Sequence, residues 1–155
     1  MRLKIGRLIV SVAICLLAGA IGSFFTAPAI ETWYGSLNKP AFTPPGWLFA
    51  PAWTILYMLM GISLYLVWQK GFKKNLFAIK IFFLQLVLNA AWSIIFFGLK
   101  NPTFAFLEIT GLWLVIILTI KVFLPISKIA AYLLVPYLLW VTFASFLNLS
   151  IVFLN

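Results

Sequence analysis

The sequence predicts an all-α integral membrane protein, built as a bundle of five transmembrane helices with a structured outer loop between the first two. Of the 155 residues, 65% are hydrophobic and 8% are charged, whereas a typical soluble domain carries about 25% charged residues. The chain has five apolar runs, each close to the ~20 residues that a helix needs to cross about 30 Å of hydrocarbon. Because these runs do not alternate apolar and polar residues, a transmembrane barrel is disfavoured.

The boundaries of the predicted helices follow from the turns between the apolar runs. The first helix is expected at residues 5–26 and is retained in the mature protein, because Ala18, Gly19 and Gly22 are typical of a helix-packing face and not of a signal-peptide cleavage site. The other helices are expected at residues 45–69, 76–98, 103–124 and 129–153. No polar segment is long enough to fold alone, so residues 1–155 are expected to form a single domain.

The loop at residues 27–43 and the start of the next helix depart most from the hydrophobic pattern. Pro44 and Pro45 are placed to begin that helix, because proline fixes φ and lacks the N–H that a first helical turn leaves unpaired. Trp33 and Tyr34 give the loop an aromatic surface, which is unusual for a disordered segment. A loop stiffened by prolines and rich in aromatic rings predicts a lid over a flat apolar ligand.

Basic residues are divided unevenly between the two predicted sides of the membrane. Nine of the eleven lie on the N-terminal side: Arg2, Lys4, Arg7, Lys70, Lys73, Lys74, Lys80, Lys121 and Lys128. Lys39 and Lys100 lie on the other side. The positive-inside rule therefore predicts a multi-pass protein of a bacterial cell membrane, with a cytoplasmic N-terminus and an external C-terminus.

The net charge and the missing residue types limit the function classes. A net charge of +9 would suit nucleic acid, but the basic residues are scattered at helix ends, where they serve as topology signals and contacts with the lipid bilayer, so no nucleic-acid partner is predicted. The chain has no histidine, and its single cysteine, Cys15, lies inside the first span. Imidazole metal sites and histidine acid–base catalysis are excluded, so neither a metal nor a cofactor is predicted.

Three predicted helices each carry aromatic or polar side chains three or four residues apart, and hence on one face. The three stripes comprise Trp53 and Tyr57; Gln85, Asn89 and Trp92; and Trp140, Ala144, Leu147 and Asn148. Unpartnered amides are costly in hydrocarbon, so these amides are expected to face the bundle interior. The stripes then converge on one aromatic cavity of the kind that binds small molecules. The alternative is that each amide only links helices.

The remaining tryptophans and the one acid inside a span also allow two interpretations. Trp33 and Trp47 lie among prolines and polar residues and are assigned to the pocket, whereas tryptophan elsewhere often anchors helices at the membrane interface. Trp68, just before a lysine-rich turn, is predicted to be such an anchor. Glu108 is either a functional intramembrane carboxylate or a group stabilised by the dipole of a helix N-terminus.

Three motifs are similar to those of a known family. They are W-Y-x-x-L-x-K-P…P-P-x-W…W-x-x-x-Y from Trp33, Q-x-x-x-N-x-x-W-x-x-x-F-F from Gln85, and P-Y-L-x-W-x-x-F-A-x-x-L-N from Pro136. On these motifs the chain resembles the TspO/MBR family of tryptophan-rich sensory proteins and translocator proteins, which includes the peripheral benzodiazepine receptor. The resemblance implies a pocket, closed by the first loop, for porphyrins such as protoporphyrin IX, for sterols, and for synthetic isoquinoline or benzodiazepine ligands.

The resemblance also implies which residues bind the ligand. They are Tyr34, Trp47, Trp53, Tyr57, Asn89, Trp92, Trp140, Ala144, Leu147 and Asn148. Some bacterial members are reported to degrade protoporphyrin in light, which makes Trp53 and Trp140 the candidate catalytic residues. No Lys or Arg follows Lys128, so the cholesterol motif of the mitochondrial members is absent from the fifth helix, which argues against sterol transport.

Three functions fit these residues. A receptor or sensor for porphyrins and similar flat apolar molecules is preferred, because it needs only the pocket and the lid. A light-dependent porphyrin-degrading enzyme would rely on tryptophan radical chemistry. A porphyrin or sterol transporter would need alternating access, and no internal repeat or charged pathway supports it. The small residues of the first helix further predict a homodimer.

Overall fold

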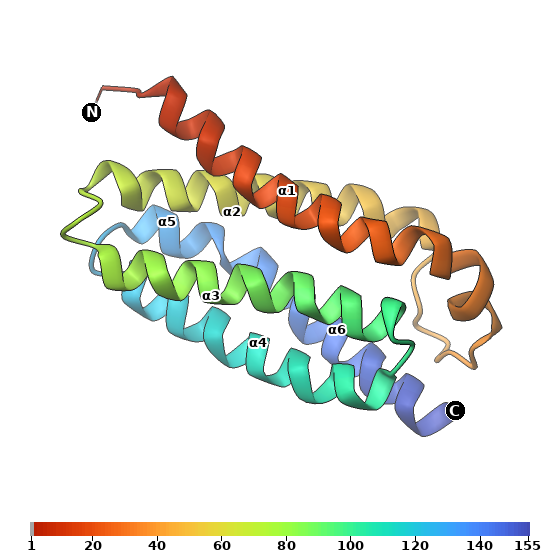
Figure 1. Cartoon of the computed structure of the whole chain (residues 1–155). Coiled ribbons are helices and arrows are strands. Elements are labelled where there is room, and N and C mark those ends of the chain that lie inside the picture. Colours follow the sequence, from red (N-terminus) through yellow and green to blue (C-terminus); the bar gives the residue numbers. More distant parts are fainter. Residues whose placement is uncertain (1) are drawn as a thin grey trace.

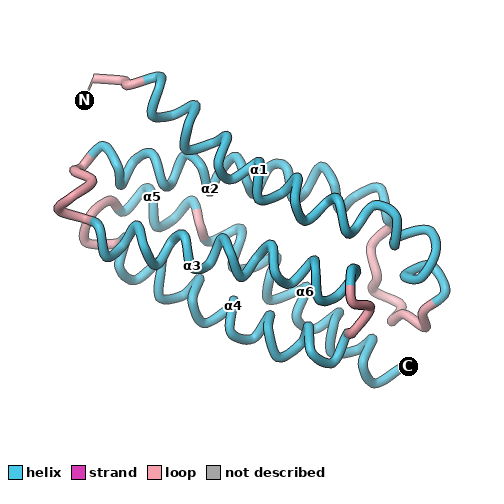
Figure 2. The backbone as a smooth tube through the Cα atoms, viewed as in Figure 1, coloured by secondary structure: helices cyan, strands magenta, loops and turns pink. Residues whose placement is uncertain are grey.

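The computed structural model describes residues 2–155, and within this range it contains helices and turns but no strand. Five helical segments are long and apolar enough to cross a membrane: Ile5–Tyr34, Gly46–Gln69, Leu76–Gly98, Pro102–Phe123 and Lys128–Leu154. They run side by side as an elongated bundle with the two termini at opposite ends (Figure 1), and Figure 2 shows that only short loops connect them. The predicted five-helix bundle is confirmed, and the protein is a multi-pass membrane protein.

The first span extends beyond its predicted end. Helix α1 (Ile5–Ala29) passes through Pro28 and continues as a π-helical turn, Ile30–Tyr34, so the prediction that a loop begins at residue 27 is wrong. At membrane depth an irregular segment would leave backbone groups unpaired, and the chain therefore stays helical although the proline removes one bond. Lys39 caps the end of this helix, because its Nζ donates to the carbonyl oxygens of Tyr34 and Leu37 at 2.8 and 3.2 Å.

The next three spans begin and end close to the predicted residues. A short 3-10 turn, Gly46–Leu48, leads into α2 (Phe49–Gln69). Helix α3 (Leu76–Ser93) finishes in a second π-helical turn, Ile94–Gly98. Helix α4 (Pro102–Phe123) begins at a proline, and the Asn101 side chain caps it by accepting the N–H of Phe104 at 3.0 Å.

The fifth span is divided into two helices, α5 (Lys128–Leu133) and α6 (Val135–Leu154), which meet at Leu134. The sequence predicted one helix over residues 129–153. Pro136 has no N–H to donate within the helix and its ring crowds the carbonyl four residues earlier, so the helix breaks at this point.

Small residues bring α1 close to α2. A Cβ added to Gly61 would lie 2.5 Å from the Cα of Val12, and one added to Gly19 would lie 2.6 Å from the Tyr57 ring. Ala18 is buried in the same core. The small residues of α1 are therefore used for packing inside the chain, which removes the reason for predicting a homodimer from them. The homodimer itself stays a prediction.

The arrangement of the spans allows a direct test of orientation. Five spans place the turn at Lys73 and the residue Asn155 at opposite ends of the bundle (Figure 1), and nine of the eleven basic residues lie at the end that holds Lys73. We expect a reporter inserted at Lys73 to be cytoplasmic and one fused after Asn155 to be external. Cytoplasmic signals from both positions would contradict this topology.

A candidate ligand cavity inside the bundle

A cavity of about 410 Å³ lies within the half of the bundle that is nearer to the loop between α1 and α2. Side chains from α1, α2, α3, α6 and the π-helical turns after α1 and α3 line it. None of the lining residues is charged, and most of them are aliphatic or aromatic. The volume falls in the range of small-molecule sites, about 300–1,000 Å³.

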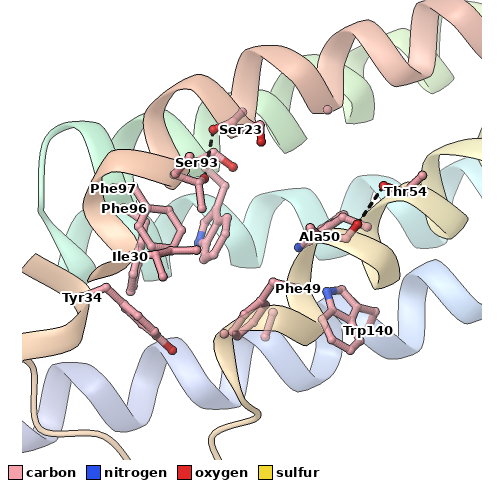
Figure 3. A pocket seen from close by; sticks show the side chains of 18 of the residues that line it. Ser23, Ile30, Tyr34, Phe49, Ala50, Thr54, Ser93, Phe96, Phe97 and Trp140 are labelled. Carbon is pink, nitrogen blue, oxygen red and sulfur yellow. Dashed lines mark hydrogen bonds between the residues drawn. The ribbon is translucent and has the colours of Figure 1, made fainter. Parts of the chain in front are cut away.

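Aromatic rings form the walls of the cavity. Trp53 stacks on Tyr57 with ring centroids 5.5 Å apart, and its edge faces Trp140 at 6.3 Å. On the opposite side Trp92 stacks on Phe96 at 5.1 Å. Figure 3 shows rings from α2, α6 and the two π-helical turns approaching the same space. Each ring offers a face or an edge to an apolar ligand, and aromatic pairs contribute about 0.5–1.5 kcal/mol beyond the area they bury.

One hydroxyl group in the cavity wall has no protein partner. The Tyr34 side chain is 6% exposed and lines the cavity, and within residues 2–155 its Oη makes no hydrogen bond. The ring is held in place by Phe49 at 6.4 Å and Phe97 at 5.7 Å (Figure 3). A buried hydroxyl without a partner is costly, so this group is available to a polar atom of a bound molecule.

A hydrogen-bonded group of three side chains adjoins the cavity through Tyr57, which lines it. The Tyr57 hydroxyl donates to Oδ1 of Asn89, and Nδ2 of Asn89 reaches the Tyr137 hydroxyl at 2.9 Å. Tyr137 and Asn89 are buried at 0% and 3% exposure. This group links α2, α3 and α6, so Asn89 supports the cavity through Tyr57 without lining it.

A second amide acts as a link beside the cavity. Asn148 accepts the indole N–H of Trp92 at 3.1 Å and donates to the Pro102 carbonyl oxygen at 2.8 Å. The bonds join α6 to α3 and to the start of α4, and they fix the plane of the Trp92 ring. Asn148 also lines the cavity.

The loop between α1 and α2 lies at one end of the bundle, where contacts with α6 and with Asn155 hold it. The Asn38 N–H donates to Oδ1 of Asn155 at 3.0 Å, and Nδ2 of Asn155 returns a bond to the Asn38 carbonyl at 2.9 Å. Phe42 packs edge-on against Phe143 with centroids 6.1 Å apart. These contacts close the end of the bundle at which the loop lies.

The structure brings eight of the twelve predicted ligand-binding residues together around the cavity. They are Tyr34, Trp53, Tyr57, Trp92, Trp140, Ala144, Leu147 and Asn148. The other four lie elsewhere. Trp33 packs on Phe96 outside the lining, and Trp47 lies on the surface with 73% of its area exposed. Gln85 and Asn89 are buried deeper in the bundle.

Sequence reasoning missed the contribution of α1. Gly19, Ser23 and Thr26 line the cavity, as do Phe49 at the start of α2 and Phe143 on α6. The α1 residues are spaced at helical intervals, and this spacing was interpreted only as a packing face. The two phenylalanines lie one turn from Trp53 and Trp140, so an extension of those stripes by one turn would have found them.

Five membrane-spanning helices around an uncharged aromatic cavity define the class: a multi-pass membrane protein with a cavity inside its helix bundle. A sequence model of the TspO/MBR family matches residues 11–154, and the chain belongs to this family. It is 49% identical over 153 residues to the tryptophan-rich protein TspO of Archaeoglobus fulgidus, covering 99% of each chain. It is 44% identical over 157 residues to TspO of Chlorobaculum tepidum, covering 100% of this chain and 99% of the relative. The human translocator protein is 37% identical over 131 residues, which are 83% of this chain and 78% of that protein.

Proposed function

We propose that this protein is a membrane receptor or sensor that binds porphyrins, such as protoporphyrin IX, and similar flat apolar ligands in the cavity beneath the loop. The observation that carries the proposal is the uncharged cavity of about 410 Å³ with aromatic walls. A planar macrocycle gains from stacking against indole and phenyl rings on several sides. The names of relatives, a tryptophan-rich sensory protein in Cereibacter sphaeroides among them, support a sensory role.

The polar groups of the cavity suggest how such a ligand would be oriented. The unpartnered Tyr34 hydroxyl lies in the wall near the loop, and it could donate to a carboxylate or carbonyl oxygen at the edge of the ligand. The group of Tyr57, Asn89 and Tyr137, which adjoins the cavity through Tyr57, has polar atoms that already bond to one another. A porphyrin would therefore bind with its apolar part towards Asn89 and its acidic edge towards the loop.

The test is a comparison of matched tryptophan substitutions. Trp140→Phe is expected to weaken protoporphyrin binding about three- to tenfold, about 1 kcal/mol, because the smaller ring loses contact with the ligand. Trp113→Phe is the control, since Trp113 lies between α4 and α6 and its N–H donates to Thr142 at 2.8 Å away from the cavity. Fluorescence quenching by protoporphyrin in detergent measures both affinities. Equal losses in the two variants would reject the cavity as the binding site.

A second function, light-dependent porphyrin degradation, is favoured by one arrangement. The Trp53 ring is in contact with both Tyr57 and Trp140, so an electron that a light-excited porphyrin takes from one of these rings could be replaced by an electron from a neighbouring ring. Loss of the porphyrin absorption bands under illumination with wild-type protein, but not with Trp53→Phe, would support the enzyme. Stable absorption bands during illumination would reject the degradation activity, and ligand binding would be the only proposed function that stands.

A further inference from the structure

The cavity is open on one side, towards the gap between α1 and α2. Ala20 and Ser23 on α1, and Ala50 and Thr54 on α2, line the cavity and are exposed on the outside of the bundle at the same time. The exposed residues of the cavity lining all come from α1 or from the N-terminal half of the second span, which places the mouth of the cavity between these two helices. Figure 3 shows Ser23 on one side of the cavity and Ala50 and Thr54 on the other. We call these four residues the side opening.

The side opening lies at the depth of the hydrocarbon. Ala20 is fifteen residues from Ile5, the first residue of a thirty-residue span, which places it about 22 Å along the helix. Leu16, one turn deeper, also lines the cavity and is 38% exposed. The α1 side of the opening is therefore expected to face lipid chains, whereas Ala50 lies close to Gly46, the first residue of its span. The side chains of the four residues are small, so they do not fill the side opening.

In contrast to the side opening, the end of the bundle near the loop is held by side-chain and backbone contacts. The reciprocal bonds between Asn38 and Asn155 and the contact of Phe42 with Phe143 fasten the loop to α6. Lys39 Nζ binds carbonyl oxygens at the end of the first span. A ligand arriving from water would have to break these contacts, whereas a ligand dissolved in the bilayer meets none of them.

We propose that ligands reach the cavity from within the bilayer, through the side opening between α1 and α2, while the loop stays fastened as a roof. The inference rests on the function proposed above and specifies the ligand class further: flat apolar molecules that partition into lipid before they bind. A passage of this kind controls both association and dissociation. An obstruction in it slows both rates, and the affinity changes little.

The experiment uses the full chain in lipid vesicles that contain protoporphyrin IX, with stopped-flow quenching of tryptophan fluorescence. Ala20→Phe and Ser23→Phe obstruct the side opening. Ala13→Phe is the matched control, because Ala13 lies two turns deeper on the same exposed face of α1 and does not line the cavity. Asn155→Ala removes the two side-chain hydrogen bonds between Asn155 and Asn38 that hold the loop between α1 and α2.

Passage through the side opening predicts that Ala20→Phe and Ser23→Phe each slow both association and dissociation by about tenfold. Ala13→Phe and Asn155→Ala should bind at the wild-type rate. Faster binding to Asn155→Ala, with Ala20→Phe and Ser23→Phe unchanged, would overturn the inference in favour of passage under the loop. Lower affinity from faster dissociation alone would also overturn it. If wild-type protein shows no saturable quenching, the proposed function fails, and this inference fails with it.

Discussion

Replacing Asn89 with leucine is expected to destabilise the folded protein by about 1–4 kcal/mol and to weaken porphyrin binding severalfold. The substitution keeps the number and branching of the side-chain heavy atoms and removes the amide that links the hydroxyls of Tyr57 and Tyr137. Each hydroxyl left unpaired costs about 1–3 kcal/mol in the interior of a soluble protein, and helix-to-helix bonds in membranes average about 0.6 kcal/mol. Binding weakens because Tyr57 is part of the cavity wall and supports Trp53.

The control for this prediction is a buried amide one turn away. Gln85 is fully buried on the same helix, and neither of its amide atoms has a hydrogen-bond partner among the described residues. Gln85→Leu removes an unpaired polar group, so it should leave stability unchanged or raise it. Thermal unfolding in detergent, followed by circular dichroism, measures both variants. If Gln85→Leu is as damaging as Asn89→Leu, any polar-to-apolar change in α3 is harmful and the specific role of the Asn89 bonds is rejected.

The walls of the cavity that come from α2, α3 and α6 could be predicted because the helical period alone puts their residues on one face. Trp53 and Tyr57, or Trp140 and Asn148, are large or polar and are marked by their chemistry. The α1 residues of the wall are small, and neither their size nor their chemistry distinguishes them from ordinary packing residues. Whether Gly19 or Ser23 packs against a neighbour or borders a cavity depends on how α1 crosses α2, and the spacing of small residues is the same in both cases.

The failures in the loop and at the helix ends have a different cause. Trp47 was assigned to the pocket by its neighbours in sequence, yet the path of the loop turns its ring outward, with 73% of it exposed. The first helix, predicted to end at residue 26, continues through Pro28, whereas Pro136 lies inside the predicted fifth helix and divides it. The local preference of proline is the same at both sites, and the surrounding packing decides the outcome.

Replacing Gly61 with alanine is expected to destabilise the bundle by about 1–3 kcal/mol, the usual cost of overpacking a core. The new Cβ would lie 2.5 Å from the Cα of Val12 and 3.0 Å from its N. These are backbone atoms, so no side-chain rotation can relieve the overlap, and α1 has to move away from α2. Because both helices border the cavity, we also expect weaker porphyrin binding from this one methyl group.

Gly111→Ala makes the same chemical change where there is room. Gly111 lies inside α4, and a Cβ there meets nothing within 4 Å. Alanine favours a helix over glycine by about 1 kcal/mol, so Gly111→Ala should raise the melting temperature in detergent while Gly61→Ala lowers it. The opposite signs separate packing from helix propensity, because propensity alone would stabilise both variants. A higher melting temperature for Gly61→Ala would mean that α1 does not approach α2 as closely as the structure describes, and the α1 wall of the cavity would then have to be placed differently.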